Sequence, residues 1–477
     1  DYFNGMEDEN IVQAIPNAKA SEWMEENIPL FECPQHNFEE MYYYRWWTLR
    51  KHIKETPVGY GMTEFLVNRS YADKYNLIAC AIGHHIYESR WLRNPEYLNQ
   101  IIHTWYRGNE GGPMAKMTKF SSWNADAVLG RYMVDGNKEF LLDMVKDLEA
   151  EYARWEKTNR LPNGLYWQGD VQDGMEESIS GGRRKQYARP TINSYMYGNA
   201  KALSLIGIMT GDEGMAMKYG LKADSIKTLV QDKLWNTDHH FFETMRGDAS
   251  AEVREAIGYI PWYFNLPDAS SKYTVAWKEV MDEKGFSAPY GLTTAERRHP
   301  EFRTHGVGKC EWDGAIWPFA SAQTLTAMAN FMNNYPQTVL TDSVYFHQME
   351  RYVESQHHRG RPYIGEYLDE VTGYWLKGDQ ERSRYYNHST FNDLMITGLI
   401  GLRPRMDNTV EVNPLIPEGK WDYFCLDNVL YHGRNLTILW DKDGSRYQRG
   451  KGLHIYVDGK EVGHADTLTR VLCENVL

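Results

Sequence analysis

The spacing of apolar residues predicts a mainly helical chain. Hydrophobic side chains recur three and four residues apart, which is the period of an amphipathic helix, in about a dozen stretches before residue 405. A short amphipathic piece near 21–27 lies in an otherwise irregular leader. We expect the longer helices over 37–54, 74–92, 95–107, 122–134, 137–158, 190–210, 213–235, 249–257, 268–282, 315–333, 338–358 and 388–401.

The pattern changes after residue 405. Segments 409–413, 436–440 and 452–457 alternate or run apolar and are followed by Asp-Gly turns, which is typical of β-strands. Helices first and strands last predict two packed units rather than an alternating α/β sheet. We expect a leader over 1–36 that packs on a barrel, a helical barrel over 37–405 and a β-rich domain over 406–477.

About twelve helices with uneven connections indicate a mainly α fold, an (α/α)6 toroid in which six inner helices surround a pit. Connections 159–189, 283–314 and 359–387 are too long to be simple turns, and long structured loops usually carry function. A helical solenoid would need a fixed repeat, which the sequence lacks.

Composition narrows the class of partner. The 477 residues carry a net charge of −13, which argues against nucleic acid or an anionic membrane surface as the partner. No apolar run approaches the roughly 18 residues of a membrane span. No signal peptide is present and the first residue is Asp1, so we expect an upstream segment to have been removed. The five cysteines form no CxxC pair and are expected to be free thiols, with one disulfide left open for an exported protein.

Aromatic residues and acidic loops supply the candidate chemistry. Phe, Trp and Tyr make up 14% of the chain, and aromatic faces stack on the C–H faces of sugar rings. Two acidic clusters, 166–182 and 362–375, place carboxylates among aromatics and glycines inside two of the long connections. Glycoside hydrolysis needs one protonated acid and one carboxylate on opposite sides of the scissile bond, and two such loops fit that need.

Two motifs give the chain a resemblance to a known family. Trp312-Asp-Gly-Ala-Ile-Trp-Pro318 is similar to a Trp-x-Gly-x-x-Trp-Pro segment, and Gly365-Glu-Tyr-Leu-Asp-Glu-Val-Thr-Gly373 is similar to a Glu-Tyr/Phe-x-x-x-x-Thr-Gly segment. Both belong to the inverting (α/α)6 glycosidases of the trehalase, processing α-glucosidase and mannosylglycerate hydrolase group, which the chain resembles from about Phe38 to Arg405. Blocks 31–34 and 386–393 are similar to barrel proteins of polysaccharide-degrading bacteria, which implies a periplasmic or secreted enzyme.

The resemblance implies roles for three carboxylates. Glu366 takes the place of the general base. The general acid of the group lies in Glu-Ser-Gly-x-Asp-x-Ser, and alignment on the Gly and Ser of Gln172-Asp-Gly-Met-Glu-Glu-Ser178 puts Glu176 in its place. Asp173 is the alternative acid. This departure indicates a subgroup with its own substrate rather than a trehalase or a plain α-glucosidase.

The implied enzyme is an exo-acting, inverting glycosidase that takes an oligosaccharide or polysaccharide and needs no cofactor or metal. The short Asp441-Lys-Asp-Gly444 turn is too short for a calcium loop, although a structural calcium stays open. The sequence carries no signal for an oligomeric state. The residues expected to line the sugar pocket are Arg45, Trp46, Trp123, Asn124, Trp167, Gln168, Arg189, Asn193, Tyr195, Trp312, Asp313 and Trp317.

Three other interpretations use different residues. A metal enzyme could use the stripe His347, Glu350, Glu354 and His358, but a solvated helix face explains the stripe without a metal, since no second matching helix occurs. A polysaccharide lyase on the same toroid would pair Tyr187 with arginines 183, 184 and 189 against a uronate. A non-catalytic carbohydrate-binding protein would keep the aromatics without needing two acidic loops.

Overall fold

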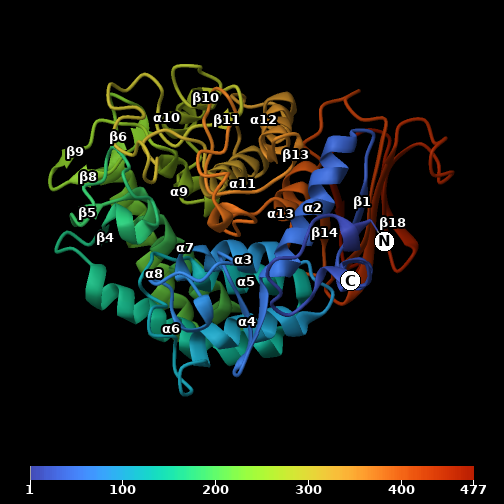
Figure 1. The fold of residues 1–477 in the computed structure, drawn as a ribbon, viewed down its shortest axis with the longest axis horizontal. Coiled ribbons are helices and arrows are strands. Elements are labelled where there is room, and N and C mark those ends of the chain that lie inside the picture. The colour runs from blue at the N-terminus through green and yellow to red at the C-terminus, as the bar shows by residue number, and fades with distance from the viewer. Residues whose placement is uncertain (1) are drawn as a thin grey trace.

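Helices alternate between outer and inner positions in the computed structural model, which describes residues 2–477 (Figure 1). The outer helices are α2 (His36–His52), α4 (Pro95–Arg107), α6 (Lys138–Asn159), α8 (Glu213–Leu229), α10 (Ser271–Thr274) and α12 (Asp342–Ser355). The inner helices are α3 (Ile82–Ser89), α5 (Asn124–Asp135), α7 (Pro190–Thr210), α9 (Ile260–Tyr263), α11 (Pro318–Asn334) and α13 (Asn392–Leu394). Each inner helix contacts the next and α13 contacts α3, so the ring closes and the predicted (α/α)6 toroid is confirmed.

Several predicted helices are shorter than their patterns or change type. The stretch over 268–282 becomes α10 followed by a 3-10 turn, Val275–Val280. The stretch over 388–401 becomes α13 followed by a π-helical turn, Met395–Leu399. A π-helical turn also extends α8 through Val230–Leu234.

Local signals set the ends of the long inner helices. Proline occupies the first turn of α7 and of α11, where its missing N–H costs no hydrogen bond. Gly136 after α5 and Gly211 after α7 have φ values of 67° and 75°, the left-handed conformation that ends a helix at low cost in glycine.

The helix predicted over 249–257 is wrong. The structure has a hairpin there, β8 (Met245–Arg246) with β9 (Ala249–Ser250), followed by a 3-10 turn over Ala256–Tyr259. Glu255 forms an antiparallel bridge with Ala295, and that backbone pairing replaces the local helical hydrogen bonds. Tertiary context has overridden a weak helical pattern.

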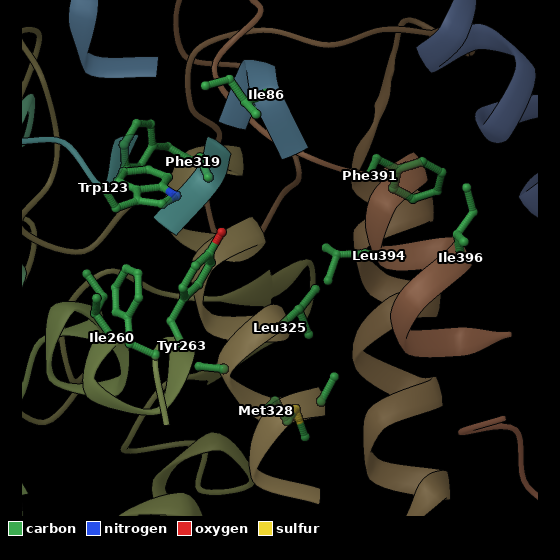
Figure 2. Close-up of a cluster of buried hydrophobic side chains, with 14 of the residues drawn as sticks. Ile86, Trp123, Ile260, Tyr263, Phe319, Leu325, Met328, Phe391, Leu394 and Ile396 are labelled. Atoms are coloured by element: carbon green, nitrogen blue, oxygen red, sulfur yellow. The ribbon is translucent and has the colours of Figure 1, made fainter. Parts of the chain in front are cut away.

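The inner helices bury a continuous apolar core (Figure 2). Trp123, directly before α5, packs edge-on against Tyr263 of α9 with ring centroids 5.9 Å apart and against Phe319 of α11 at 6.3 Å. The same cluster includes Ile86 of α3, Leu325 of α11 and Leu394 of α13, all buried. Large side chains from separate inner helices therefore fill the middle of the toroid.

The C-terminal strands form a sheet that recruits part of the leader. Its order is β1-β15-β16-β17-β18, and β1 (Leu30–Glu32) pairs antiparallel with β15 (Tyr423–Tyr431). The leader, expected only to pack on the barrel, therefore also supplies an edge strand to the C-terminal domain. It also contains α1 (Ala20–Asn27), as the short amphipathic piece predicted. Strands β16 (Arg434–Asp441), β17 (Gly452–Val457) and β18 (Lys460–Ala465) complete this sheet, while β14 (Val410–Val412) and β19 (Val471–Cys473) pair with each other in a separate two-stranded sheet.

Trp421 joins the sheet to the barrel. Its ring lies 5.3 Å from Phe38 of α2 and 5.4 Å from Phe346 of α12, and its indole N–H donates to Gln35 Oε1 at 2.6 Å. Phe31 of β1 packs between this tryptophan and Tyr42 of α2. One aromatic cluster thus fixes the leader, the first barrel helix and the β domain together.

Two features are absent from residues 2–477. No helix in that range is long and apolar enough to cross a bilayer. Within the same range, no group of three or more His, Cys, Asp or Glu side chains could hold a metal ion. Of the proposed metal stripe, Glu350 pairs with Lys420 at 2.8 Å, and His358 lies beyond α12 and contacts Asp379 at 3.2 Å.

Replacing Phe31 by alanine is expected to lower the free energy of unfolding by about 3–5 kcal/mol, because a buried ring is removed from the interdomain cluster. Leu30→Ala is the matched control on the same strand, since Leu30 is 41% exposed, and it should cost less than about 1 kcal/mol. Urea unfolding followed by tryptophan fluorescence measures both. Equal losses from the two substitutions would show that the cluster does not hold the domains together.

Candidate functional site

The loops that lead from an outer helix into an inner helix all lie at one end of the toroid, because the inner helices run in the same direction. Five of these six loops contribute to a cavity of about 310 Å³. Its residues are Glu64, Phe65, Tyr71, Ile78 and Cys80 before α3, Lys119 and Phe120 before α5, Val171, Gly174 and Glu176 before α7, Cys310, Trp317 and Phe319 around the start of α11, and Glu366, Arg382, Tyr386 and His388 before α13.

A larger cavity, of about 390 Å³, lies among the helices themselves and has a different character. Its carboxylates are already engaged: Asp126 accepts from Tyr87 at 2.6 Å, and Asp393 pairs with Arg90 at 2.8 Å. None of the acidic loop residues lines it. The loop cavity is therefore the better candidate for chemistry.

Glu176 and Glu366 lie in the wall of the same loop cavity, although nearly two hundred residues separate them in the sequence. Burial raises the pKa of Glu176 to about 7, and the negative charge of Glu366 raises this pKa as well. Glu176 therefore holds its proton up to neutral pH.

Glu366 has a different electrostatic environment. Lys377 Nζ lies 3.3 Å and Arg382 Nη2 3.5 Å from Glu366 Oε2, and the Glu366 side chain is only 6% exposed. Both cations contact one oxygen, so Oε1 carries neither ion pair. The cavity thus holds one proton-bearing carboxyl and one ion-paired carboxylate, an arrangement that separates an acid from a base.

Glu64 is a third cavity carboxyl, which the sequence analysis missed. Burial raises its pKa to about 8, and the charges of Glu366 and Glu176 add to the shift. Cys80 Sγ lies 3.6 Å from Glu64 Oε2. The available signal was its position, beside an aromatic residue in the loop before an inner helix. The expected helix over 74–92 left only 55–73 as a connection there, so the loop was not singled out, although in the structure it runs from the end of α2 to the start of α3.

His388 faces Glu64 across the buried end of the cavity. Its Nδ1 lies 3.9 Å from Glu64 Oε1, and burial holds the pKa of His388 well below its usual range, so the ring is neutral. Its Nε2 makes no hydrogen bond within residues 2–477. A neutral imidazole and a protonated carboxyl at this end can bind sugar hydroxyls without a buried net charge.

Asp173, the alternative acid, lies behind the cavity rather than in its wall. Arg189 Nε donates to Asp173 Oδ2 at 2.6 Å and Thr191 Oγ1 to the same oxygen at 2.5 Å, while Ser121 Oγ donates to Oδ1 at 2.7 Å. Neither side chain of the Asp173–Arg189 pair is exposed. This buried pair anchors the loop that carries Glu176.

Of the twelve residues expected to line the sugar pocket, Trp317 alone lines the loop cavity. Trp312 lies directly behind it, stacked on Trp317 with ring centroids 4.4 Å apart. Asp313 accepts the backbone N–H groups of His305 and Gly306, which shapes the same loop. Trp312 and Asp313, which were also expected to line the pocket, therefore support this loop from behind the cavity wall.

The other expected pocket residues hold the loops and helices in place. Arg45 donates to Gln356 and Ser389, which fixes the two ends of the loop that carries Glu366. Four more of these residues are already hydrogen-bonded within the protein: Asn124 to Glu151, Gln168 to Ser121, Asn193 to Tyr166 and Tyr195 to Gln323. Trp46 and Trp123 are fully buried, and Trp167 pairs with Ala188 in the small sheet of β4 (Trp167–Gln168), β5 (Tyr187–Ala188), β8 and β9.

Comparison with known proteins identifies the domains of the chain. The model of the mannosylglycerate hydrolase MGH1-like glycoside hydrolase domain matches residues 74–389, and that of the glycosyl hydrolase family 65 C-terminal domain matches residues 402–464. A solved structure named "Sialidase" is 86% identical with a TM-score of 0.99; the match covers 100% of this chain and 44% of that one. This chain therefore spans less than half the length of that relative.

More distant structures share the fold. The GH63 mannosylglycerate hydrolase from Thermus thermophilus, solved with glucose, has a TM-score of 0.55 at 12% identity, and the match covers 75% of this chain and 99% of that one. The GH78 family rhamnosidase of a Bacillus species has a TM-score of 0.59 at 10% identity, with 87% and 40% covered.

The raised pKa of Glu64 predicts a pH-dependent loss of stability. The folded protein keeps this proton up to about pH 8 while the unfolded chain releases it near pH 4.5, so rising pH favours unfolding across that window. Glu64→Gln should therefore reduce the fall in thermal midpoint between about pH 5 and about pH 8. Glu25→Gln, at an exposed position of α1, is the control and should reproduce the wild-type profile. Parallel profiles for Glu64→Gln and wild type would show that Glu64 is ionised in the folded protein.

Proposed function

Because this chain belongs to the mannosylglycerate hydrolase MGH1-like glycoside hydrolase family, we propose that it removes one terminal sugar from an oligosaccharide or polysaccharide with inversion at the anomeric carbon. The observation that carries the proposal is the pair Glu176 and Glu366 in the wall of one cavity. Aromatic side chains, among them Trp317 and Tyr386, line the same space and can stack on a sugar ring.

In the proposed mechanism Glu176 donates its proton to the glycosidic oxygen as the bond from that oxygen to the anomeric carbon breaks. A water molecule attacks the anomeric carbon from the opposite face, and Glu366 takes its proton. The products are a free sugar and a shortened glycan with a new hydroxyl group. Inversion requires room for the water, so the carboxyl groups should act across roughly 6.5–9.5 Å.

The size of the cavity supports removal of a terminal sugar. At about 310 Å³ it lies at the lower end of ligand pockets, which span roughly 300–1,000 Å³. Its inner end is closed by buried residues, Glu64 and His388. Such a pocket accommodates the end of a glycan better than its middle. A substrate of this kind also supports a periplasmic or secreted location.

The alternative activities have weaker support. None of the four residues named for a lyase, Tyr187 and arginines 183, 184 and 189, lines the loop cavity, and Arg189 is buried in its pair with Asp173. The name "Sialidase" belongs to a protein of which this chain covers 44%, so it does not assign that activity to this segment. A terminal sialic acid is accordingly one substrate to include in the first screen.

Product analysis tests the proposal. Incubation with plant, algal and sialylated oligosaccharides, followed by proton NMR from the first minutes, should show one monosaccharide released with the anomeric configuration opposite to that of the bond cleaved. Retention of configuration would exclude single displacement. Release of internal fragments would exclude removal from the chain end.

Glu176→Gln and Glu366→Gln are each expected to lower kcat by about a hundredfold or more, because each removes a proton-transfer group. In the free wild-type enzyme kcat/KM should fall as pH rises through about 7, where Glu176 loses its proton, and this limb should be absent from the residual activity of Glu176→Gln. Asp173→Asn is the comparison variant, and circular dichroism confirms folding of all three. Loss of turnover in folded Asp173→Asn with normal turnover in Glu176→Gln would transfer the acid role to Asp173.

A further inference from the structure

Basic side chains surround the loop cavity of a protein whose net charge is −13. We define the cationic rim as Lys119, Arg183, Lys309, Lys377 and Arg382. These five residues come from four separate loops, which precede α5, α7, α11 and α13. Clustering from four loops distinguishes the rim from an ordinary run of charge along one solvated segment.

Specific contacts place each member beside the catalytic carboxylates. Lys119 and Arg382 line the cavity itself, and Lys377 pairs with Glu366. Arg183 and Lys309 both contact Glu177, the residue that follows Glu176. Glu177 has a φ of 68°, so the backbone turns between the two glutamates, with Glu176 in the cavity wall and Glu177 toward the rim.

The rim carries more positive than negative charge. Four of its five cations contact just two carboxylates, Glu177 and Glu366, while the raised pKa of Glu176 keeps that group protonated up to about pH 7. Lys119 has no carboxylate partner within residues 2–477; its Nζ lies 3.3 Å from the carbonyl oxygen of Tyr71. Arg184 and Lys185 continue the exposed loop after Arg183. An excess of this kind attracts anions into the adjacent cleft.

The exposed fractions of the side chains show which end of the cavity faces solvent. The side chains of Glu64 and His388, at the inner end of the cavity, are 3% and 2% exposed. The side chains of Arg183 and Lys309 are 58% and 66% exposed. Arg183 and Lys309 therefore lie on the solvent side, where the part of a glycan beyond the scissile bond would emerge, whereas Lys377 is 9% exposed and stays beside Glu366.

We propose that the cationic rim binds the carboxylates of uronic acid residues in the part of the glycan that stays behind, so that the preferred substrate is a terminal sugar attached to an acidic oligosaccharide. This inference rests on the proposed function, because it assigns the cavity to the sugar that is removed. Carboxylates suit the rim because arginine and lysine form charge-assisted hydrogen bonds with them.

Binding to a matched pair of trisaccharides tests the rim directly. Trigalacturonate and galactotriose share the galacto configuration and differ in the carboxylates, so isothermal titration at low salt should show binding of the first at least about tenfold tighter than the second. The affinity for trigalacturonate should fall as sodium chloride is raised. Equal affinity for the two sugars, or affinity insensitive to salt, would overturn the proposal.

Charge removal locates the site. Lys309→Ala and Arg183→Ala change exposed side chains, and each should weaken trigalacturonate binding by about tenfold, the loss of one charge-assisted contact. Lys460→Ala, on the exposed start of β18, is the matched control and should bind as wild type does. If all three variants bind trigalacturonate equally, the anion lies elsewhere and the rim has no such role.

Kinetics separate this inference from the proposed function. Once the released sugar is known, the same sugar linked to a uronate and to a neutral acceptor should give a lower KM for the uronate, and Lys309→Ala should raise that KM relative to the KM for the neutral substrate. Equal KM values would contradict uronate binding at the rim but leave the proposed hydrolase activity intact. Binding of trigalacturonate without release of sugar from any glycan would support uronate binding at the rim and contradict the proposed hydrolysis.

Discussion

The common direction of the six inner helices is the constraint on which the site depends. Because these helices run parallel around a closed ring, every loop that enters one must lie at the same end. Carboxylates far apart in the sequence, such as Glu64 and Glu366, are thereby brought into one cavity. The ring thus determines where the chemistry is assembled.

Behind the cavity, buried polar contacts fix the loops. Asp173 and Arg189 form a fully buried ion pair, and Arg45 ties together the ends of the Glu366 loop. Buried charges are costly unless they are fully hydrogen-bonded, so such contacts add little to stability by themselves. They exclude other loop conformations instead, and the positions of Glu176 and Glu366 rest on that restriction. Acid–base chemistry needs this fixed geometry more than it needs extra stability.

The fold was predictable to a greater extent than the composition of the pocket wall. Apolar spacing identified most long helices because inner and outer helices each bury a continuous stripe, whereas at 249–257 backbone pairing with Ala295 replaced the expected helix. The two acidic loops were recognisable because glutamates among aromatics are unusual in long connections. A sequence does not distinguish a residue in a cavity wall from one directly behind it, so Trp317 and Trp312 were equally good candidates for lining the pocket. Glu64 was missed because its only mark is its position before α3.

Pairing between β1 and β15 has a consequence for how the protein is made. Leu30 leaves the ribosome long before its partner Asp427, because the whole barrel is synthesised between them. Until then the apolar face of α2 around Phe38 lacks Trp421, the ring that covers it. The nascent barrel therefore exposes an apolar surface throughout its own synthesis, and such a surface favours aggregation and chaperone binding. Sealing that surface has to wait for the β domain, so premature termination before β15 would leave a chain prone to aggregate.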